Sequence, residues 1–220
     1  MTSSSDRPWL KSYPSWVPAT IDADHYRNIM EVFDEACGKF AKRPAFTNMG
    51  HSLSYDELGK LSRRFAAFLT QECKLKPGDR IALQLPNLLQ YPVALFGAIR
   101  AGLIVVNTNP LYTEREMQHQ FKDSGAKAIV ILANFADKLE HILPQTQIET
   151  VIITELGDLF PAPKRWVINA ALKYIKKMVP TYNLKHYTLR VALGAGGRDK
   201  FHDHQIQSSD FTSQERRVGK

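Results

Sequence analysis

The sequence predicts an α/β fold in which helices flank a mainly parallel sheet, and features of its middle region carry this prediction. Short runs of aliphatic and β-branched residues recur at 80–85, 103–107, 128–132 and 150–154. Segments with helical spacing separate the runs. The runs themselves are apolar on both faces, so each strand needs cover on both sides, which parallel sheets obtain from their crossover helices.

The region before the first strand is expected to contain an extended segment and a helix. Proline at positions 8, 14 and 18 disfavours regular structure, so residues 1–26 are predicted to lie as an extended strap over the domain. Apolar residues at helical spacing predict a helix over 27–42 with one buried face.

A hairpin and a second helix are expected to follow. Residues 45–48 and 52–54 can pair around Gly50. Ser54 and Glu57 then have the spacing of a capping box, which places the start of a helix immediately after the hairpin.

The helices between the predicted strands have clear start and stop signals. Residues 87–101 form the first, with Pro92 near its first turn and Gly102 where a left-handed cap is needed. Thr113 and Glu116 form a second capping box, and Gly125 ends that helix. A short helix over 135–143 is expected to stop at Pro144.

Composition restricts the class of protein. The chain has 220 residues, 44% of them hydrophobic, and contains no apolar run long enough to span a bilayer. Its first residues lack the apolar core of a signal peptide, which predicts a cytoplasmic protein. Cys37 and Cys73 are expected to be buried, reduced thiols.

Charge divides the chain unevenly. Of the 29 Lys and Arg residues, twelve lie after residue 160, against four of the 22 Asp and Glu residues. We therefore expect three sections: a strap at 1–26, an α/β subdomain at 27–160, and a basic extension at 161–220 that holds an amphipathic helix at 164–179 and an irregular tail.

Several motifs resemble a known family. These are DRIA at 79–82, RAG at 100–102, NTNPLYT at 107–113 and DSGA at 123–126. Together they resemble the N-terminal region of the AMP-forming acyl-CoA synthetases, and most closely the bacterial long-chain fatty acid–CoA ligases. The resemblance implies the first subdomain of the adenylate-forming synthetase fold, incomplete in this chain. It also implies a reaction in which a long-chain fatty acid and ATP give an acyl-adenylate, which coenzyme A then converts to acyl-CoA, with Mg²⁺ assisting the first step.

The resemblance further implies a Ser/Thr/Gly-rich phosphate loop just after residues 202–210, where the sequence instead reads FTSQERRVGK. The expected function is therefore that of a truncated N-terminal portion of a long-chain fatty acid–CoA ligase, inactive by itself. No catalytic, cofactor-binding or metal-binding residue is assigned, and ATP, coenzyme A and Mg²⁺ are not expected to bind strongly. The alternatives are a noncatalytic membrane- or acyl-binding module, or a gene fragment without independent function.

Three short motifs suggest chemistry but favour simpler interpretations. The GAGG run at 194–197 suggests a phosphate loop, yet no helical pattern follows it, which favours a flexible loop. The HDH run at 202–204 suggests a metal site but has no third ligand nearby, which favours a solvated loop. The TERE run at 113–116 lies where α/β folds bind ligands, but a capped surface helix explains it.

Residues 164–179 are the segment in which a functional interpretation is favoured. At 100° per residue, one arc gathers Arg165, Asn169, Lys173, Lys176 and Lys177, and the remaining arc is apolar. Such a helix is typical of the membrane interface, which predicts binding to the anionic inner face of the cell membrane; the alternative is that its apolar face packs on the domain. Nucleic acid is not an expected partner because the basic tail lacks interleaved aromatic residues.

Overall fold

The computed structural model describes residues 7–22, 25–196, 202–207 and 213–214. Within these residues, six strands form an all-parallel sheet in the order β7-β6-β5-β3-β4-β8. The predicted α/β class with a parallel sheet is confirmed. The four longer strands are β3 (Arg80–Gln84), β4 (Ile104–Asn107), β5 (Ala128–Leu132) and β6 (Thr150–Thr154), and the edge strands are β7 (Tyr187–Thr188) and β8 (Ser213–Gln214).

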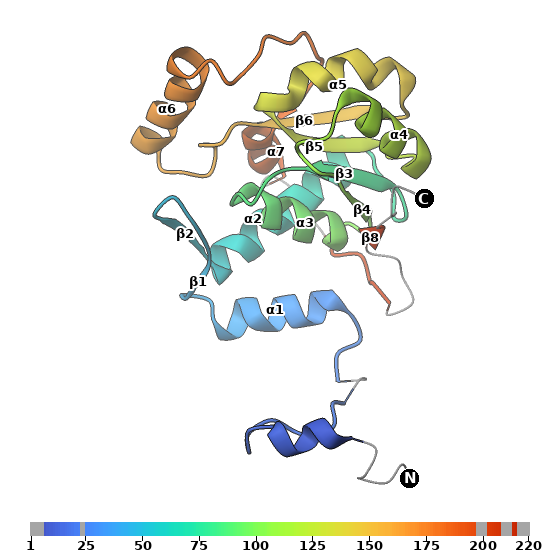
Figure 1. Ribbon diagram of the computed structural model, residues 1–220, viewed down its shortest axis with the longest axis vertical. Helices are drawn as coiled ribbons and strands as arrows, with labels where there is room; N and C mark the ends of the chain where they lie inside the picture. The colour runs from blue at the N-terminus through green and yellow to red at the C-terminus, as the bar shows by residue number, and fades with distance from the viewer. Residues whose placement is uncertain (1–6, 23–24, 197–201, 208–212, 215–220) are drawn as a thin grey trace.

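Helices cover both faces of the sheet (Figure 1). On one face lie α2 (Tyr55–Ala67), α3 (Gln90–Arg100) and α7 (Leu189–Ala195); on the other lie α4 (Glu114–Ser124) and α5 (Ala136–Ile142). The strands alternate between the two cores: Ile81 and Leu83 pack toward α2 and α3, whereas Ala82 packs toward α4 and α5. This alternation explains why the strand sequences are apolar throughout.

Most helix ends lie where local sequence signals predicted them. Both capping boxes are present, at Ser54 and at Thr113. Gly102 and Gly125 adopt the left-handed backbone, with φ of 76° and 63°, that ends the preceding helices.

Helix α1 (Ile29–Lys39) is shorter than the predicted 27–42, and the start of α3 also differs from the prediction. Helix α3 begins at Gln90, three residues after the predicted position 87. The intervening residues form a turn in which the backbone N–H of Leu88 donates to the carbonyl of Pro86 at 2.7 Å.

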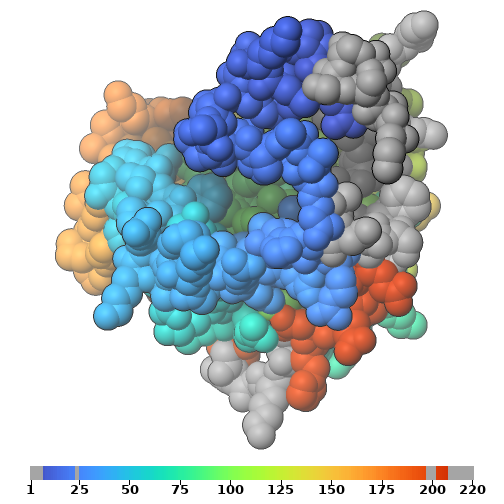
Figure 2. Space-filling view, turned by 90° about the horizontal axis from the view of Figure 1, so that it is seen from below, coloured from blue at the N-terminus to red at the C-terminus, as the bar shows by residue number. Residues whose placement is uncertain are grey.

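Helix α1 (Ile29–Lys39) and the hairpin of β1 (Pro44–Asn48) and β2 (His51–Ser54) lie on the outer side of α2 and α3 (Figure 1). The expectation that the N-terminal segment lies over the domain is wrong for residues 7–22. They form one short 3₁₀ turn, η2 (Pro8–Ser12), and none of their side chains is buried. Figure 2 shows this segment, in dark blue, on the outside of the molecule.

The C-terminal region also departs from the sequence-based expectation. The predicted helix over 164–179 is observed as α6 (Ala162–Ala170) and a π turn, η6 (Ala171–Ile175), and Lys177 then adopts a positive φ of 49°. The expectation of an irregular tail is wrong for residues 187–195. They add β7 to the sheet and fold into α7, whose Leu189 is fully buried. The division of the chain into three sections stays a prediction.

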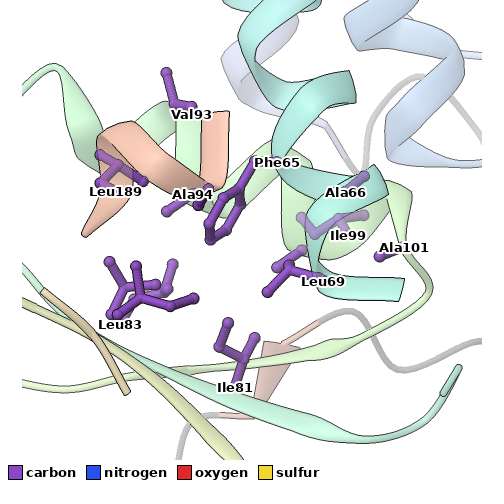
Figure 3. Close-up of a cluster of buried hydrophobic side chains, with 14 of the residues drawn as sticks. Phe65, Ala66, Leu69, Ile81, Leu83, Val93, Ala94, Ile99, Ala101 and Leu189 are labelled. Carbon is purple, nitrogen blue, oxygen red and sulfur yellow. The ribbon is translucent and has the colours of Figure 1, made fainter. Parts of the chain in front are cut away.

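Helices α2 and α3 pack closely because Gly97 has no side chain. A Cβ atom there would lie 2.8 Å from Phe65 Cδ1 and 2.9 Å from the carbonyl oxygen of Ser62. Figure 3 shows Phe65 pointing into the core beside Ala94, above Leu83 and Ile81 of the sheet. The ring therefore has little room to move away from an added methyl group.

We expect Gly97→Ala to lower the free energy of unfolding by about 2 kcal/mol, because the cost of overpacking exceeds the gain in helix propensity. Gly38, within α1, is the matched control, because no described atom lies within 4 Å of an added Cβ. Gly38→Ala should raise the stability by up to about 1 kcal/mol. Urea unfolding measures both changes, and equal effects of the same sign would contradict the packing argument.

Candidate functional site

The carboxyl ends of the parallel strands lie at one edge of the sheet, the usual position of ligand sites in α/β folds. Polar side chains gather at this carboxyl edge. Tyr91 Oη donates to Asn107 Oδ1 at 2.9 Å, and Gln120 Nε2 donates to the Asn107 carbonyl at 3.0 Å. Gln84 is fully buried at the end of β3, and in the part of the chain that the structure describes its Oε1 atom has no hydrogen-bond partner.

Two carboxylates lie close together just after β6. Asp158 Oδ2 accepts hydrogen bonds from Thr154 Oγ1 and from the backbone N–H of Glu155, each at 2.9 Å. Burial raises the pKa of Asp158; burial and the charge of Asp158 raise the pKa of Glu155. Cavities of about 460 and 320 Å³ flank the pair, and Arg190 lines both. The bonds made by Asp158 close the turn after β6, which gives this residue a structural role.

Helix α6, the η6 turn and the residues up to Met178 present an apolar surface to solvent. Trp166 is 64% exposed and Ile175 is 77% exposed, and no residue of α6 is buried. Lys173, Lys176 and Lys177 are exposed beside them. We call this set the α6 surface; its apolar members are Trp166, Val167, Tyr174, Ile175 and Met178.

The body of the protein contacts the other side of α6, which includes two residues of the predicted polar arc. Arg165 and Asn169 are half-buried, and Asn169 hydrogen-bonds to the turn after β6. The alternative interpretation, in which the apolar arc packs on the domain, is wrong for Val167, Tyr174 and Ile175, whereas Ile168 does pack against the main core.

Arg100, at the end of α3, is a buried cation that the sequence reasoning missed. Its side chain is 1% exposed and forms ion pairs with Asp34 of α1 and Asp203. Asp203 also pairs with Arg63 of α2, with 2.9 Å between Nη1 and Oδ1. Arg100 lines two cavities of about 860 and 630 Å³, and its Nε atom has no hydrogen-bond partner among the described residues. In the sequence, Arg100 lies near alanine and glycine residues at a helix end, and these neighbours do not indicate its ion pairs.

Comparison with known protein families shows the family of this chain. The family model described as AMP-binding enzyme matches residues 33–200. The chain belongs to this family. The resemblance inferred from the motifs is thereby confirmed.

Individual members of the AMP-binding family show how much of the enzyme this chain spans. It is 48% identical over 204 residues to the long-chain-fatty-acid–CoA ligase of Salmonella typhimurium, which covers 92% of this chain and 36% of that protein. A ligase of the same name from Haemophilus influenzae is 45% identical over 207 residues, covering 94% of this chain and 37% of the relative. The chain therefore spans about a third of the length of these relatives.

Solved structures of two CoA ligases share the fold. A structure of an anthranilate–CoA ligase with anthranoyl-AMP gives a TM-score of 0.68 at 12% identity, covering 86% of this chain and 32% of that one. A long-chain-fatty-acid–CoA ligase from Archaeoglobus fulgidus gives a TM-score of 0.64 at 17% identity, covering 86% and 34%. At these identities the likeness shows the fold alone.

The motifs singled out in this member of the AMP-binding enzyme family have structural explanations. The expectation of a flexible loop at 194–197 is wrong for Gly194 and Ala195, which lie in the last turn of α7; Gly197 falls outside the described residues. A phosphate would need the opposite end of that helix. The TERE run begins α4 as predicted, and Glu114 Oε1 lies 2.8 Å from His141 Nδ1, an interaction that raises the pKa of His141.

The HDH run is a loop, but its central residue is an ion-pair partner rather than a solvated group. Asp203 is half-buried against Arg100, while His202 and His204 are exposed. In the part of the chain that the structure describes, no group of three or more His, Cys, Asp or Glu side chains could hold a metal ion. Nor does any described helix have the length and hydropathy to cross a membrane.

Proposed function

We propose that this chain forms the N-terminal sheet region of an AMP-forming ligase that joins long-chain fatty acids to coenzyme A at the expense of ATP. The observation that carries the proposal is 48% identity over 92% of the chain to a relative that bears this name. In the whole enzyme, ATP would activate the fatty acid carboxylate as an acyl-adenylate, and the thiol of coenzyme A would displace AMP. Mg²⁺ would neutralise phosphate charge in the first step.

We assign the described residues no step of this reaction. Phosphates commonly bind to free N–H groups at a helix N-terminus. In α2, α4 and α7 the side chains of Ser54, Thr113 and Thr188 accept from those groups instead. The acids after β6 serve the turn and α6. The sheet and the helices that cover it therefore support the carboxyl edge structurally.

A chimaeric enzyme tests the proposal. Residues 7–207 would replace the matching segment of the Salmonella typhimurium relative. We expect ATP-dependent formation of long-chain acyl-CoA by the chimaera, and no fatty-acid-dependent pyrophosphate release by the isolated chain above a no-protein control. A folded chimaera that makes no acyl-CoA, or turnover by the isolated chain, would contradict the proposed role.

We further propose that the α6 surface docks on the anionic, cytoplasmic face of the cell membrane. Support comes from the exposed apolar side chains of α6 and from the three lysines beside them. Aromatic and aliphatic residues enter the interfacial region of a bilayer, and lysines attract its anionic lipids. The four cavities described above do not favour the alternative of acyl-chain binding without a membrane, because charged and polar side chains largely line them.

Fluorescence of Trp166 tests this docking. With Trp9 and Trp16 replaced by phenylalanine, Trp166 is the only remaining tryptophan of the chain. Its emission should shift to shorter wavelength with phosphatidylglycerol-containing vesicles and stay unchanged with neutral phosphatidylcholine vesicles. An unchanged spectrum with both vesicle types would exclude membrane docking by α6.

A further inference from the structure

The segment that carries the α6 surface is attached to the carboxyl edge of the sheet at two points. At the first point, Asn169 of α6 donates from Nδ2 to Glu155 Oε2 at 2.6 Å. The same amide accepts at Oδ1 from the backbone N–H of Gly157 at 2.8 Å. Both polar atoms of the Asn169 side chain are thus used to hold α6 on the turn after β6.

The second point lies after β5. Asn134 Nδ2 donates to the carbonyl oxygen of Met178 at 2.9 Å, at the end of the segment. The neighbouring Val179 packs against the core beneath α4 and α5, and the N–H of Asn183 donates to Glu140 Oε2 of α5 at 3.0 Å. Residues 161–179 are therefore held near the middle, at Asn169, and at the end, at Met178, by groups that follow adjacent strands.

The turn that holds Asn169 is itself anchored to the core. Gln90, buried at the start of α3, donates from Nε2 to the carbonyls of Glu155 and Leu156 at 2.9 and 3.1 Å. Close packing adds to these bonds, because a Cβ atom on Gly157 would lie 2.5 Å from Asn169 Oδ1 and 3.0 Å from the Arg165 carbonyl. The attachment leaves little freedom to tilt α6 relative to the sheet.

We infer that Asn134 and Asn169 are positioning residues that turn the carboxyl edge of the sheet toward the membrane when the α6 surface docks. The inference rests on the proposed membrane docking and concerns orientation rather than affinity. The polar tethers face the sheet while Trp166, Val167 and Tyr174 face outward, so a docked α6 lies between the bilayer and the carboxyl edge (Figure 1). This edge is where α/β folds bind ligands. An acyl chain with a terminal carboxylate would then reach it from the bilayer by a short path through little water.

Energy transfer to a dye-labelled lipid measures this orientation. Donors are attached to cysteine at Leu111, exposed after β4, or at Lys76, exposed before β3, with Cys37 and Cys73 replaced by alanine. The two sites lie at opposite edges of the sheet, roughly 16 Å apart along a five-residue strand. On phosphatidylglycerol-containing vesicles, we expect higher transfer from residue 111 than from residue 76.

The tether variants separate orientation from binding. In Asn134→Ala/Asn169→Ala, and independently in Gly157→Ala, vesicle co-sedimentation should persist while the difference between the two donors disappears. Gln118→Ala is the matched control, because it removes an amide hydrogen bond to Gln145 on the surface formed by α4. It should retain the full difference.

Each outcome bears on a stated claim. Equal transfer from both donors in the parent, or an unchanged difference in both tether variants, would overturn the inference while membrane docking stands. A parent that does not bind vesicles would overturn both. Trypsin cleavage at Lys173 and Lys176 without vesicles gives a separate check, since both tether variants should be cut faster than the parent, and equal rates would show that the tethers do not hold α6.

Discussion

Replacing both Asp34 and Asp203 by asparagine is expected to lower the free energy of unfolding by about 3 kcal/mol, because it leaves the Arg100 guanidinium buried without a counter-ion. Arg100 is 1% exposed, whereas the carboxylates of Asp34 and Asp203 are 44% and 31% exposed. The lower end of the range for broken buried pairs applies, since the cavities beside Arg100 can admit water. Each single variant should cost less, because one carboxylate remains.

An exposed ion pair provides the control for this result. Arg27 and Glu31 pair one helical turn apart, with the arginine side chain 84% exposed. Glu31→Gln should change the free energy of unfolding far less than the double variant does, because solvent screens an exposed ion pair. Urea unfolding with a common slope would measure all four variants. If the double variant lost no more free energy of unfolding than Glu31→Gln, contacts other than the two ion pairs would stabilise the buried Arg100 side chain.

Reversing Lys173, Lys176 and Lys177 to glutamate is expected to weaken binding to anionic vesicles by on the order of 100-fold or more. Each basic residue near an anionic surface contributes about 1 kcal/mol, and 1.4 kcal/mol corresponds to a tenfold change. The apolar members of the α6 surface remain, so weak binding to neutral vesicles should hardly change. Added salt should reduce the difference between parent and variant, since the Debye length is about 8 Å at physiological ionic strength.

The control for this variant carries the same change in net charge at three positions outside the α6 surface. Lys74, Lys76 and Lys122 are exposed and lie outside the α6 surface. Their reversal to glutamate should reduce co-sedimentation far less than reversal on α6. Equal losses from the two triple variants would mean that overall charge, and not the α6 surface, governs binding.

The sequence predicted those parts of the fold that depend on neighbouring residues. The strands 128–132 and 150–154 were located to the residue, because each is an apolar run between helical segments. The capping boxes at Ser54 and Thr113 were equally clear, since both partners of each box lie three residues apart. Gly102 and Gly125 were identified as helix ends for the same local reason.

Features set by distant contacts escaped prediction. Arg100 pairs with residues 66 positions before it and 103 positions after it, so no local window contains its partners. Helix α7 was missed because the run at 194–197 suggested a loop, whereas burial of Leu189 and Ala192 stabilises the helix. Periodicity identified the amphipathic segment but could not show that Asn169 faces the body, which depends on Gly157 and Glu155.

The ion pair between Arg100 and Asp203 also imposes an order on folding during synthesis. Asp203 is made 103 residues after Arg100, which takes on the order of 5 to 20 seconds at ribosomal rates of about 5–20 residues per second. Asp34 is already available in this interval, but the pairing of Asp203 with Arg100 and Arg63 cannot yet form. The layer of α1, α2 and α3 therefore stays incompletely closed around Arg100 until the chain has passed residue 203, and the guanidinium remains accessible to water during that time.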